Sequence, residues 1–189
     1  MIIGICGKSG TGKSTIAKEL EKRGYQKIIT DTTRPKRKGE ENGVDYWFDT
    51  DEEFDEFLRE GEFIETTSYK VANGETWRYG TTIGQYNEVK GNGVIVLNPS
   101  GVKAFKEKGL EIKIFLIETE EPEILSRLRK RGDNWKEVLR RMKADAEDFK
   151  NIRNYIDYAV YNNSNTNIKD LTDTIINLAK VRDLAEETK

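Results

Sequence analysis

Residues 7–15 read GKSGTGKST and contain a Gly-x-x-x-x-Gly-Lys-Ser pattern. Glycines at this spacing let the backbone wrap closely around an anion, with successive N–H groups pointing inward at it. Lys13 is expected to reach the β- and γ-phosphates of a nucleoside triphosphate, and the Ser14 hydroxyl is expected to ligate Mg²⁺. An apolar stretch precedes the loop and a helical pattern follows it, which disfavours the alternative of a glycine-rich turn that merely starts a helix.

Triphosphate binding by itself does not separate a kinase from a switch or a motor. The residues of the loop expected to contact ATP are Gly7, Ser9, Gly10, Thr11, Gly12, Lys13, Ser14 and Thr15. The stretch that discriminates is 30–48, TDTTRPKRKGEENGVDYWF, in which Arg34 and Arg37 lie three residues apart. Two guanidinium groups at close quarters suit a dianionic phosphate, although a solvated basic loop is the commoner fate of such a charge run.

The composition excludes several other kinds of chemistry. The 189 residues include no histidine, which rules out a hydrolase with an imidazole base and a His-ligated zinc site. A net charge of −2 argues against general nucleic-acid binding, and no apolar run approaches the ~18 residues of a membrane span. The single cysteine, Cys6, lies in an apolar strand and suits a reducing cytosol, so we expect a buried core residue in a cytoplasmic protein.

Strands and helices alternate along the chain. Apolar runs predict five strands of one sheet, at 1–6, 26–30, 93–98, 111–117 and 157–162. Helical patterns are found at 14–24, 99–109, 122–132, 134–152 and 168–187. Smaller elements are expected at 44–48, 51–61 and 63–69. This alternation implies an α/β fold, with a parallel five-stranded sheet flanked by helices and an insertion at the carboxyl edge of the sheet.

The segment 32–48 resembles the signature of the guanylate kinase family, in which T-x-R-x-x-R is followed by G-E-x-N-G-x-D-Y. The spacing agrees without a gap from Arg34 to Tyr46. Further similar segments follow in chain order: EFIE (62–65), YGT (79–81), RLRKRG (127–132), RRM (140–142) and YAVYNN (158–163). The likeness covers nearly the whole chain and implies a P-loop nucleoside monophosphate kinase.

The resemblance implies roles for the matching residues. The catalytic set would be Lys13, Arg34, Arg37, Arg131 and Arg141. The acceptor nucleotide would contact Thr30, Arg34, Arg37, Tyr46, Glu65, Tyr79, Gly80, Thr81 and Asn98. Glu65 would accept hydrogen bonds from the guanine N1–H and exocyclic amine. Arg127 would add to the ATP site, Asn162 or Asn163 would lie near the adenine, and Ser14 would ligate the metal.

The same resemblance implies how the single domain, 1–189, is organised. It would have a core (1–31, 92–126 and 156–189), an α+β insertion that binds the nucleoside monophosphate (about 32–91), and a helical lid (about 127–155). Lid closure would deliver Arg131 and Arg141 to the moving phosphoryl group. On charge alone, Arg127 and Arg131 would be expected only to pair with nearby acids such as Glu123.

The implied reaction is transfer of a phosphoryl group from ATP to GMP or dGMP, with Mg²⁺. The implied partners are these small molecules, without nucleic acid or membrane, for a monomer or homodimer. One alternative is a kinase on the same scaffold for another acceptor, either a different nucleoside monophosphate or ribose 1,5-bisphosphate. A non-catalytic protein-binding module is less favoured, because Lys13 and Ser14 are intact.

Two departures from the family pattern affect the acceptor site. The stretch between Glu65 and Tyr79 is longer than usual, with an Asn-Gly pair at 73–74 that is typical of a hairpin turn. The pocket therefore has a different rim, and Trp77 is a candidate to line it, although a packed aromatic is the commoner fate of such a residue.

The second departure lies in VIVLNPSG (94–101), where the family shows D-x-D-x-Q-G. Val96 and Asn98 replace the two aspartates, of which the first supports Mg²⁺ and the second helps to read the guanine amine. We expect the Asn98 carbonyl still to accept one hydrogen bond in the pocket. Asp31 is the first candidate for the missing acid.

Overall fold

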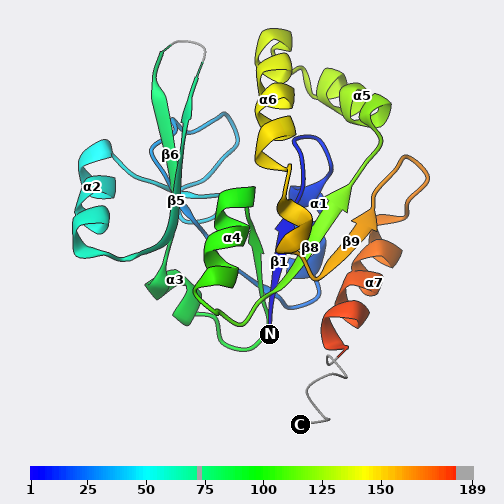
Figure 1. Cartoon of the computed structure of the whole chain (residues 1–189), viewed down its shortest axis with the longest axis horizontal. Helices are drawn as coiled ribbons and strands as arrows, with labels where there is room; N and C mark the ends of the chain where they lie inside the picture. Colours follow the sequence, from blue (N-terminus) through cyan, green and yellow to red (C-terminus); the bar gives the residue numbers. More distant parts are fainter. Residues whose placement is uncertain (72–73, 182–189) are drawn as a thin grey trace.

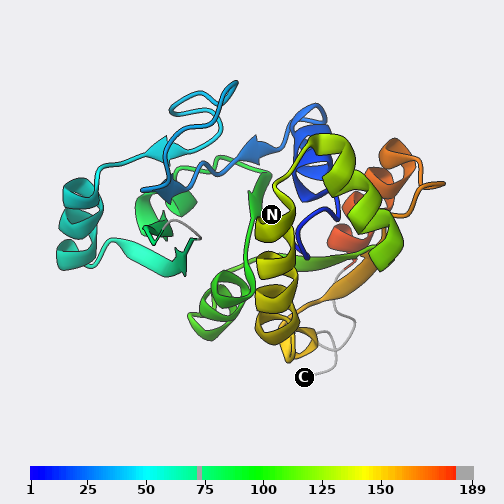
Figure 2. The ribbon, with the colours of Figure 1, turned by 90° about the horizontal axis from the view of Figure 1, so that it is seen from above.

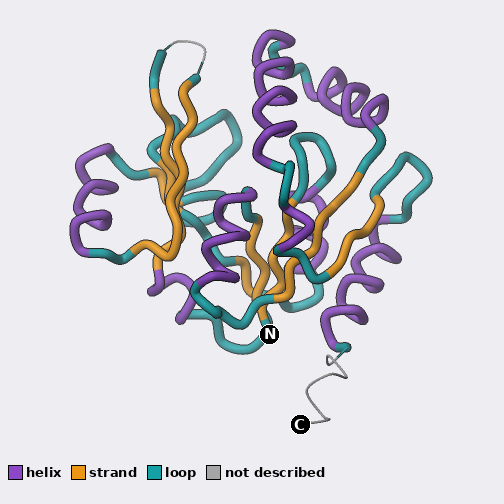
Figure 3. The backbone as a smooth tube through the Cα atoms, viewed as in Figure 1, coloured by secondary structure: helices purple, strands orange, loops and turns teal. Residues whose placement is uncertain are grey.

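A five-stranded parallel sheet forms the centre of the molecule, as predicted, and a second sheet stands beside it (Figures 1 and 3). The computed structural model describes residues 1–71 and 74–181. The central sheet has the order β2-β7-β1-β8-β9, from strands β1 Ile2–Cys6, β2 Gln26–Lys27, β7 Gly93–Val96, β8 Lys113–Glu118 and β9 Tyr158–Tyr161. The second has the order β4-β3-β6-β5, from strands β3 Asp31–Thr32, β4 Trp47–Phe48, β5 Phe63–Lys70 and β6 Thr76–Thr82.

Helices connect and cover these strands. They are α1 Lys13–Glu21, α2 Asp51–Glu60, α3 Ile83–Asn87, α4 Pro99–Glu107, α5 Glu121–Arg131, α6 Trp135–Asp148, α7 Ile168–Lys180 and a 3₁₀ turn at Ile152–Asn154. Viewed from above, the second sheet and α2 extend to one side of the central sheet, and α6 lies between them and α1 (Figure 2). None of the helices in the described part of the chain is long and apolar enough to cross a membrane.

Strand β1 is buried on both faces, as the middle strand of a parallel sheet must be. Successive side chains of a strand point to opposite faces, so Ile3 and Ile5 pack with residues of α1 and α7, whereas Ile2 and Cys6 pack with residues of α4. Burial raises the pKa of the Cys6 thiol to about 12. Cys6 is therefore the buried core residue that the sequence predicted.

The predicted strand at 26–30 is in fact divided between the two sheets. The Ile28 N–H still donates to the Val94 carbonyl in the central sheet (2.8 Å), but the Thr30 carbonyl already accepts from Trp47 of the second sheet (3.0 Å). The chain therefore crosses between the sheets within two residues. This crossing places the arginine-rich segment that follows at the carboxyl edge of the central sheet.

Other differences are confined to the second sheet. Only Trp47–Phe48 of the expected strand at 44–48 is extended, because Gly43 turns the chain with a φ of 75°. The expected hairpin turn at 73–74 implied a strand after it, but the range of β6 was not predicted, and neither was helix α3. The Asn73 of the expected hairpin turn and the end of the expected helix at 182–187 lie outside the described residues.

A buried acid in the second sheet gives a stability prediction. Asp49 Oδ2 is buried without a hydrogen-bond partner among the described residues. Burial, and then the charges of Asp31 and Glu53, raise the pKa of Asp49 from 3.8 to about 7. The folded state therefore holds this proton more tightly than the unfolded chain, and stability is lost as the pH rises from about 4 to about 7.

We expect Asp49→Asn to raise the free energy of unfolding by about 1 kcal/mol at pH 8, where wild-type Asp49 is ionised, and to have little effect at pH 4. Urea unfolding at the two pH values measures the difference. Asp170→Asn, at an exposed position of α7, serves as the matched control. An equal gain at both pH values would contradict this explanation.

Candidate active site

The loop between β1 and α1 is held by a residue that follows β9, the edge strand of the central sheet. Asn162, which directly follows β9 and is 6% exposed, donates from Nδ2 to the Thr11 carbonyl (2.8 Å). Within the loop, the Thr11 hydroxyl donates to the Lys8 carbonyl (2.9 Å). Gly12 has a φ of 93°, and a Cβ there would overlap with Asn162 Nδ2, so only glycine fits. These contacts within the protein fix the shape of the loop.

The loop surrounds the Lys13 ammonium. Lys13 Nζ donates to the carbonyls of Gly7 (2.6 Å) and Lys8 (2.9 Å). Burial lowers the pKa of Lys13 below its ordinary value, with nearby Asp145 acting in the opposite direction. The backbone N–H of Ser9 donates to Asp145 Oδ2 (3.0 Å). A carboxylate from α6 thus takes a hydrogen bond from an amide of the loop expected to cradle phosphate.

Arg34 is fixed by its surroundings. It is only 3% exposed, and its guanidinium donates to both carboxylate oxygens of Glu40 (2.9 and 2.8 Å). The same group lies over the rings of Tyr46 and Phe48, at 5.3 and 5.5 Å from their centroids. A bidentate ion pair and two aromatic faces leave little rotational freedom. Arg34 is therefore a rigid, partly neutralised cation.

Arg37 differs from Arg34. Its guanidinium makes no hydrogen bond or salt bridge with the described residues, whereas its backbone N–H donates to Glu40 Oε2 (2.8 Å) and its carbonyl accepts from the Glu40 N–H (3.1 Å). Burial, and then the positive charges of Arg34 and Arg141, lower the pKa of Arg37 below its ordinary value. Three cations so placed create a positive potential, and Arg37 is the one with a free fork for an anion.

Glu65 is held at the end of the site opposite the arginines. Its Oε1 accepts from the hydroxyl of fully buried Thr81 (2.9 Å), whereas its Oε2 is buried and has no partner among the described residues. Burial raises the pKa of Glu65 to about 7, with the Thr81 hydrogen bond acting against the shift. A buried acceptor without a partner costs free energy unless a donor arrives. This oxygen therefore favours a ligand with an N–H group.

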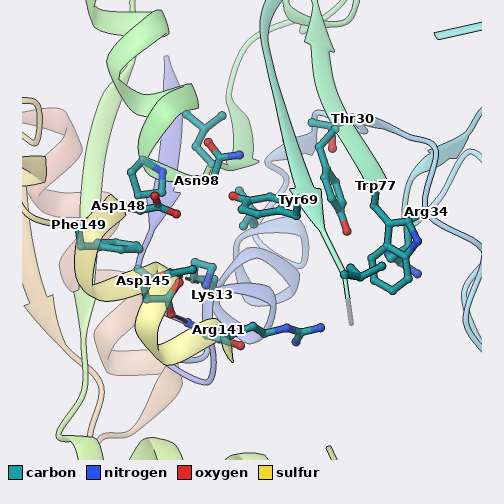
Figure 4. Close-up of a pocket in the computed structure, with 18 of the residues that line it drawn as sticks. Lys13, Thr30, Arg34, Tyr69, Trp77, Asn98, Arg141, Asp145, Asp148 and Phe149 are labelled. Carbon is teal, nitrogen blue, oxygen red and sulfur yellow. Dashed lines mark hydrogen bonds between the residues drawn. The ribbon is translucent and has the colours of Figure 1, made fainter. Parts of the chain in front are cut away.

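A cavity of about 300 Å³ connects the loop, the arginines and Glu65 (Figure 4). Its size suits a small-molecule site. Sequence-predicted residues that line it are Gly7, Ser9, Lys13, Thr30, Arg34, Arg37, Tyr46, Glu65, Tyr79, Gly80, Asn98 and Arg141. Predicted residues that do not line it are Gly10, Thr11, Gly12, Ser14, Thr15, Thr81, Arg127, Arg131 and Asn162.

Comparison with known proteins identifies the family. The family model described as "Guanylate kinase" matches residues 1–178. The chain is 35% identical over 170 residues to the guanylate kinases of Streptococcus pneumoniae and Streptococcus mutans, covering 86% of this chain and 79% and 78% of theirs. The chain belongs to the guanylate kinase family. The expected resemblance and the expected fold are thereby confirmed.

Solved structures agree with this assignment. The crystal structure of guanylate kinase from Anaplasma phagocytophilum matches with a TM-score of 0.67 and 26% identity, covering 100% of this chain and 87% of that one. An uncharacterized protein from Eubacterium ventriosum shares the fold, with a TM-score of 0.53 and 16% identity, over 96% of this chain and 99% of that one.

The arginines of the segment that resembles the guanylate kinase lid are held in two places. Arg127 lies beside the loop, whereas Arg131 and Arg141 lie near Asp133, which follows α5. Arg127 pairs with Glu123 (2.9 Å), as charge alone predicts, but its Nη2 also donates to the Asn162 carbonyl beside the loop (2.9 Å). Arg131 donates to Asp133 (2.6 Å), and Arg141 lies 3.9 Å from the same carboxylate. Asp133 thus holds two of the proposed catalytic arginines near each other.

Several lining residues were missed by the sequence analysis. Those are Tyr69, Val71, Leu97, Pro99, Arg140, Ala144, Asp145, Asp148 and Phe149. The residues of α6 could have been found, since Asp145 and Asp148 lie four and seven positions after Arg141 and so share its helix face. Trp77 also lines the cavity, as the longer hairpin suggested. It pairs with Tyr69 across the β5–β6 hairpin.

The replacement of the family's two aspartates by Val96 and Asn98 has structural consequences. The expectation that the Asn98 carbonyl accepts a hydrogen bond in the pocket is wrong, because Oδ1 already accepts from the Gly101 N–H and the Ser100 hydroxyl (both 2.7 Å). Asp31 does not replace the missing acid at the cavity: its carboxylate accepts from Gln85 Nε2 (2.6 Å) and does not line the cavity. The carboxylate beside the loop is Asp145.

The donor set fits a magnesium ion that arrives with its nucleotide. The described residues include no group of three or more His, Cys, Asp or Glu side chains that could hold a metal alone. Mg²⁺ usually binds through one or two protein ligands together with substrate phosphates and waters. Ser14, at the start of α1, is the expected protein ligand, and Asp145 is an acid that accepts a hydrogen bond from the loop.

The contact of Asp145 with Ser9 gives a binding prediction. Because this carboxylate competes with phosphate for a loop amide and repels its charge, we expect Asp145→Asn to lower the Kd for ATP by about three- to tenfold. Isothermal titration calorimetry with ATP measures the change. Glu147→Gln removes the same charge from an exposed position of α6 and is the control. Weaker ATP binding in Asp145→Asn alone would show that Asp145 assists the bound nucleotide.

Proposed function

We propose that this member of the guanylate kinase family phosphorylates GMP and dGMP with ATP. The observation that carries the proposal is the unpartnered, buried Oε2 of Glu65, which lies in the same cavity as Lys13 and Arg37. An acceptor with a phosphate at one end and an N–H group at the other satisfies both. The N1–H edge of guanine supplies that donor, and the phosphate of GMP supplies the anion.

In the proposed reaction the chain acts by position and charge. Arg37 and the remaining N–H groups of Arg34 hold the acceptor phosphate, and Glu40 keeps Arg34 in place. Lys13 exchanges its carbonyl partners for oxygens of the ATP phosphates. Ser14 and the ATP phosphates would hold Mg²⁺, which would supply positive charge to the triphosphate. Alignment of the two phosphates at near-attack distance then supplies most of the rate enhancement.

We further propose the division into a core, an acceptor-binding insertion (about 32–91) and a lid (about 127–155). The β5–β6 hairpin and α6 both extend toward the top of the view in Figure 1, and residues of both line the cavity. Closure of α5 and α6 would bring Arg131 and Arg141 to the transferring group. Because ATP and GMP are cytoplasmic metabolites, the proposed substrates imply a cytoplasmic location.

The alternatives explain less of the site. Ribose 1,5-bisphosphate has no base, so it would leave the Glu65–Thr81 pair without a ligand. A protein-binding module would have no use for the braced loop around Lys13. The proposed partners are therefore ATP and the monophosphate, for a monomer or homodimer.

Loss of a cation from the site should remove most of the activity. We expect Lys13→Ala and Arg37→Ala each to lower kcat by about 100-fold or more, because each removes charge stabilisation of the transferring group. A coupled assay of ADP release with ATP and GMP measures this. Lys18→Ala, at an exposed position of α1, should leave kcat unchanged. If Arg37→Ala retains full activity, the acceptor phosphate binds elsewhere.

The raised pKa of Glu65 gives a pH prediction. Near pH 6 the free carboxyl is largely protonated, so binding of an N–H donor requires loss of this proton, and that cost disappears above about pH 7. The affinity for GMP should therefore rise from pH 6 to pH 8 more steeply in the wild type than in Glu65→Gln. Calorimetric Kd values at three pH values test this, since the titration of the GMP phosphate affects both proteins alike. Parallel profiles would contradict it.

A further inference from the structure

Asn98 performs a structural task that fixes its orientation. It follows β7 and is the N-cap of α4, with a φ of −85° and a ψ of 171°. Its Oδ1 accepts from the Gly101 N–H and from the Ser100 hydroxyl. A backbone N–H can only donate, so the oxygen of the amide must face the helix. The Nδ2 group must therefore point away from the helix.

This Nδ2 group belongs to the cavity. Asn98 lines the cavity, and Nδ2 donates to none of the residues that the structure describes. Figure 4 shows the side chain beside Tyr69, across the cavity from Arg34. A Cβ added to Gly101 would lie 3.3 Å from Asn98 Oδ1 and 3.4 Å from Glu65 Cδ. The amide of Asn98 and the carboxylate of Glu65 therefore flank the same glycine, at the same end of the cavity.

An aspartate at this position would behave differently. One carboxylate oxygen could cap α4 while the second presented an acceptor to the cavity. Asparagine can cap the helix equally well, but it then presents a donor. Asparagine in place of aspartate therefore keeps the helix cap but presents a hydrogen-bond donor to the cavity instead of an acceptor.

We infer that Asn98 removes selection for a 2-amino group on the acceptor base, so that the site accepts 6-oxopurine nucleoside monophosphates in general, IMP as well as GMP. This inference rests on the proposed function. Glu65 was expected to bind both the N1–H and the exocyclic amine, but its Oε1 already accepts from Thr81. The unpartnered Oε2 accepts the N1–H that guanine and hypoxanthine share, so recognition of the exocyclic amine depends on residue 98. The 2-amino group of guanine then meets the N–H₂ of Asn98, which is another donor. Hypoxanthine has only a C–H there and loses no hydrogen bond.

Asn98→Asp tests the inference, because it restores an acceptor without removing the cap. In the wild type, kcat/KM for GMP and for IMP should agree within about tenfold. In Asn98→Asp, the GMP:IMP ratio of kcat/KM should increase at least about tenfold, as expected for a new hydrogen bond to a charged acceptor. Thermal unfolding of the variant checks that the fold is retained.

Asn167→Asp is the matched control. Asn167 is the N-cap of α7 and accepts from the Lys169 N–H (2.9 Å), so the substitution makes the same chemical change at a helix cap that does not line the cavity. Its GMP:IMP ratio should equal that of the wild type.

The outcomes separate this inference from the proposed function. Turnover of GMP with a ratio above about 100 in the wild type, unchanged in Asn98→Asp, would overturn the inference and leave the proposed function intact. A GMP:IMP ratio that increases in Asn98→Asp and does not increase in Asn167→Asp supports the inference. If neither nucleotide is phosphorylated, calorimetric Kd values for GMP and IMP replace kcat/KM in the ratio. Failure of both to bind would contradict the proposed function and the inference together.

Discussion

Repulsion between two phosphorylated substrates is the constraint on which the rest of this structure depends. Two anions approach each other in water only against their charge, so a kinase for a nucleotide acceptor must surround the meeting point with cations. Here Lys13, Arg34, Arg37 and Arg141 line one cavity. Such a cluster is itself costly in the free protein, because burial and mutual repulsion both oppose the charged forms. The structure meets that cost differently for each cation.

The differences follow from what each cation has to do. Arg34 is neutralised by Glu40 and enclosed by aromatic rings, so it is a fixed part of the wall. Lys13 is satisfied by loop carbonyls, which phosphate oxygens can replace. Arg37 has no such partner for its guanidinium among the described residues, and burial, followed by the charges of Arg34 and Arg141, lowers its pKa. In the proposed reaction, Arg37 is therefore open to the acceptor phosphate, and Lys13 is held for the donor nucleotide.

The local parts of this arrangement could be predicted from the sequence. The loop at 7–15 and the pair of arginines at 34 and 37 are contiguous motifs, whose spacing carries their chemistry. The contribution of α6 could not be predicted with equal ease, because the contact of Asp145 with Ser9 joins residues 136 positions apart. The division of 26–30 between two sheets was also missed. A run of apolar residues predicts extended backbone but does not say which neighbour it pairs with.

Asn98 shows the same limit at the level of one side chain. Asn98 lines the cavity, but the sequence analysis expected the carbonyl end of its amide to face the ligand, and the structure turns that end toward the helix. Either end is chemically possible. That choice is made by α4, whose first turn needs an acceptor for its N–H groups. Asp and Asn are nearly equivalent as helix caps, so the fold tolerates exchange between them. They are opposite as partners for a base, so this exchange changes recognition at little cost to stability. A residue that serves both the scaffold and the site can thus alter specificity while the scaffold stays the same.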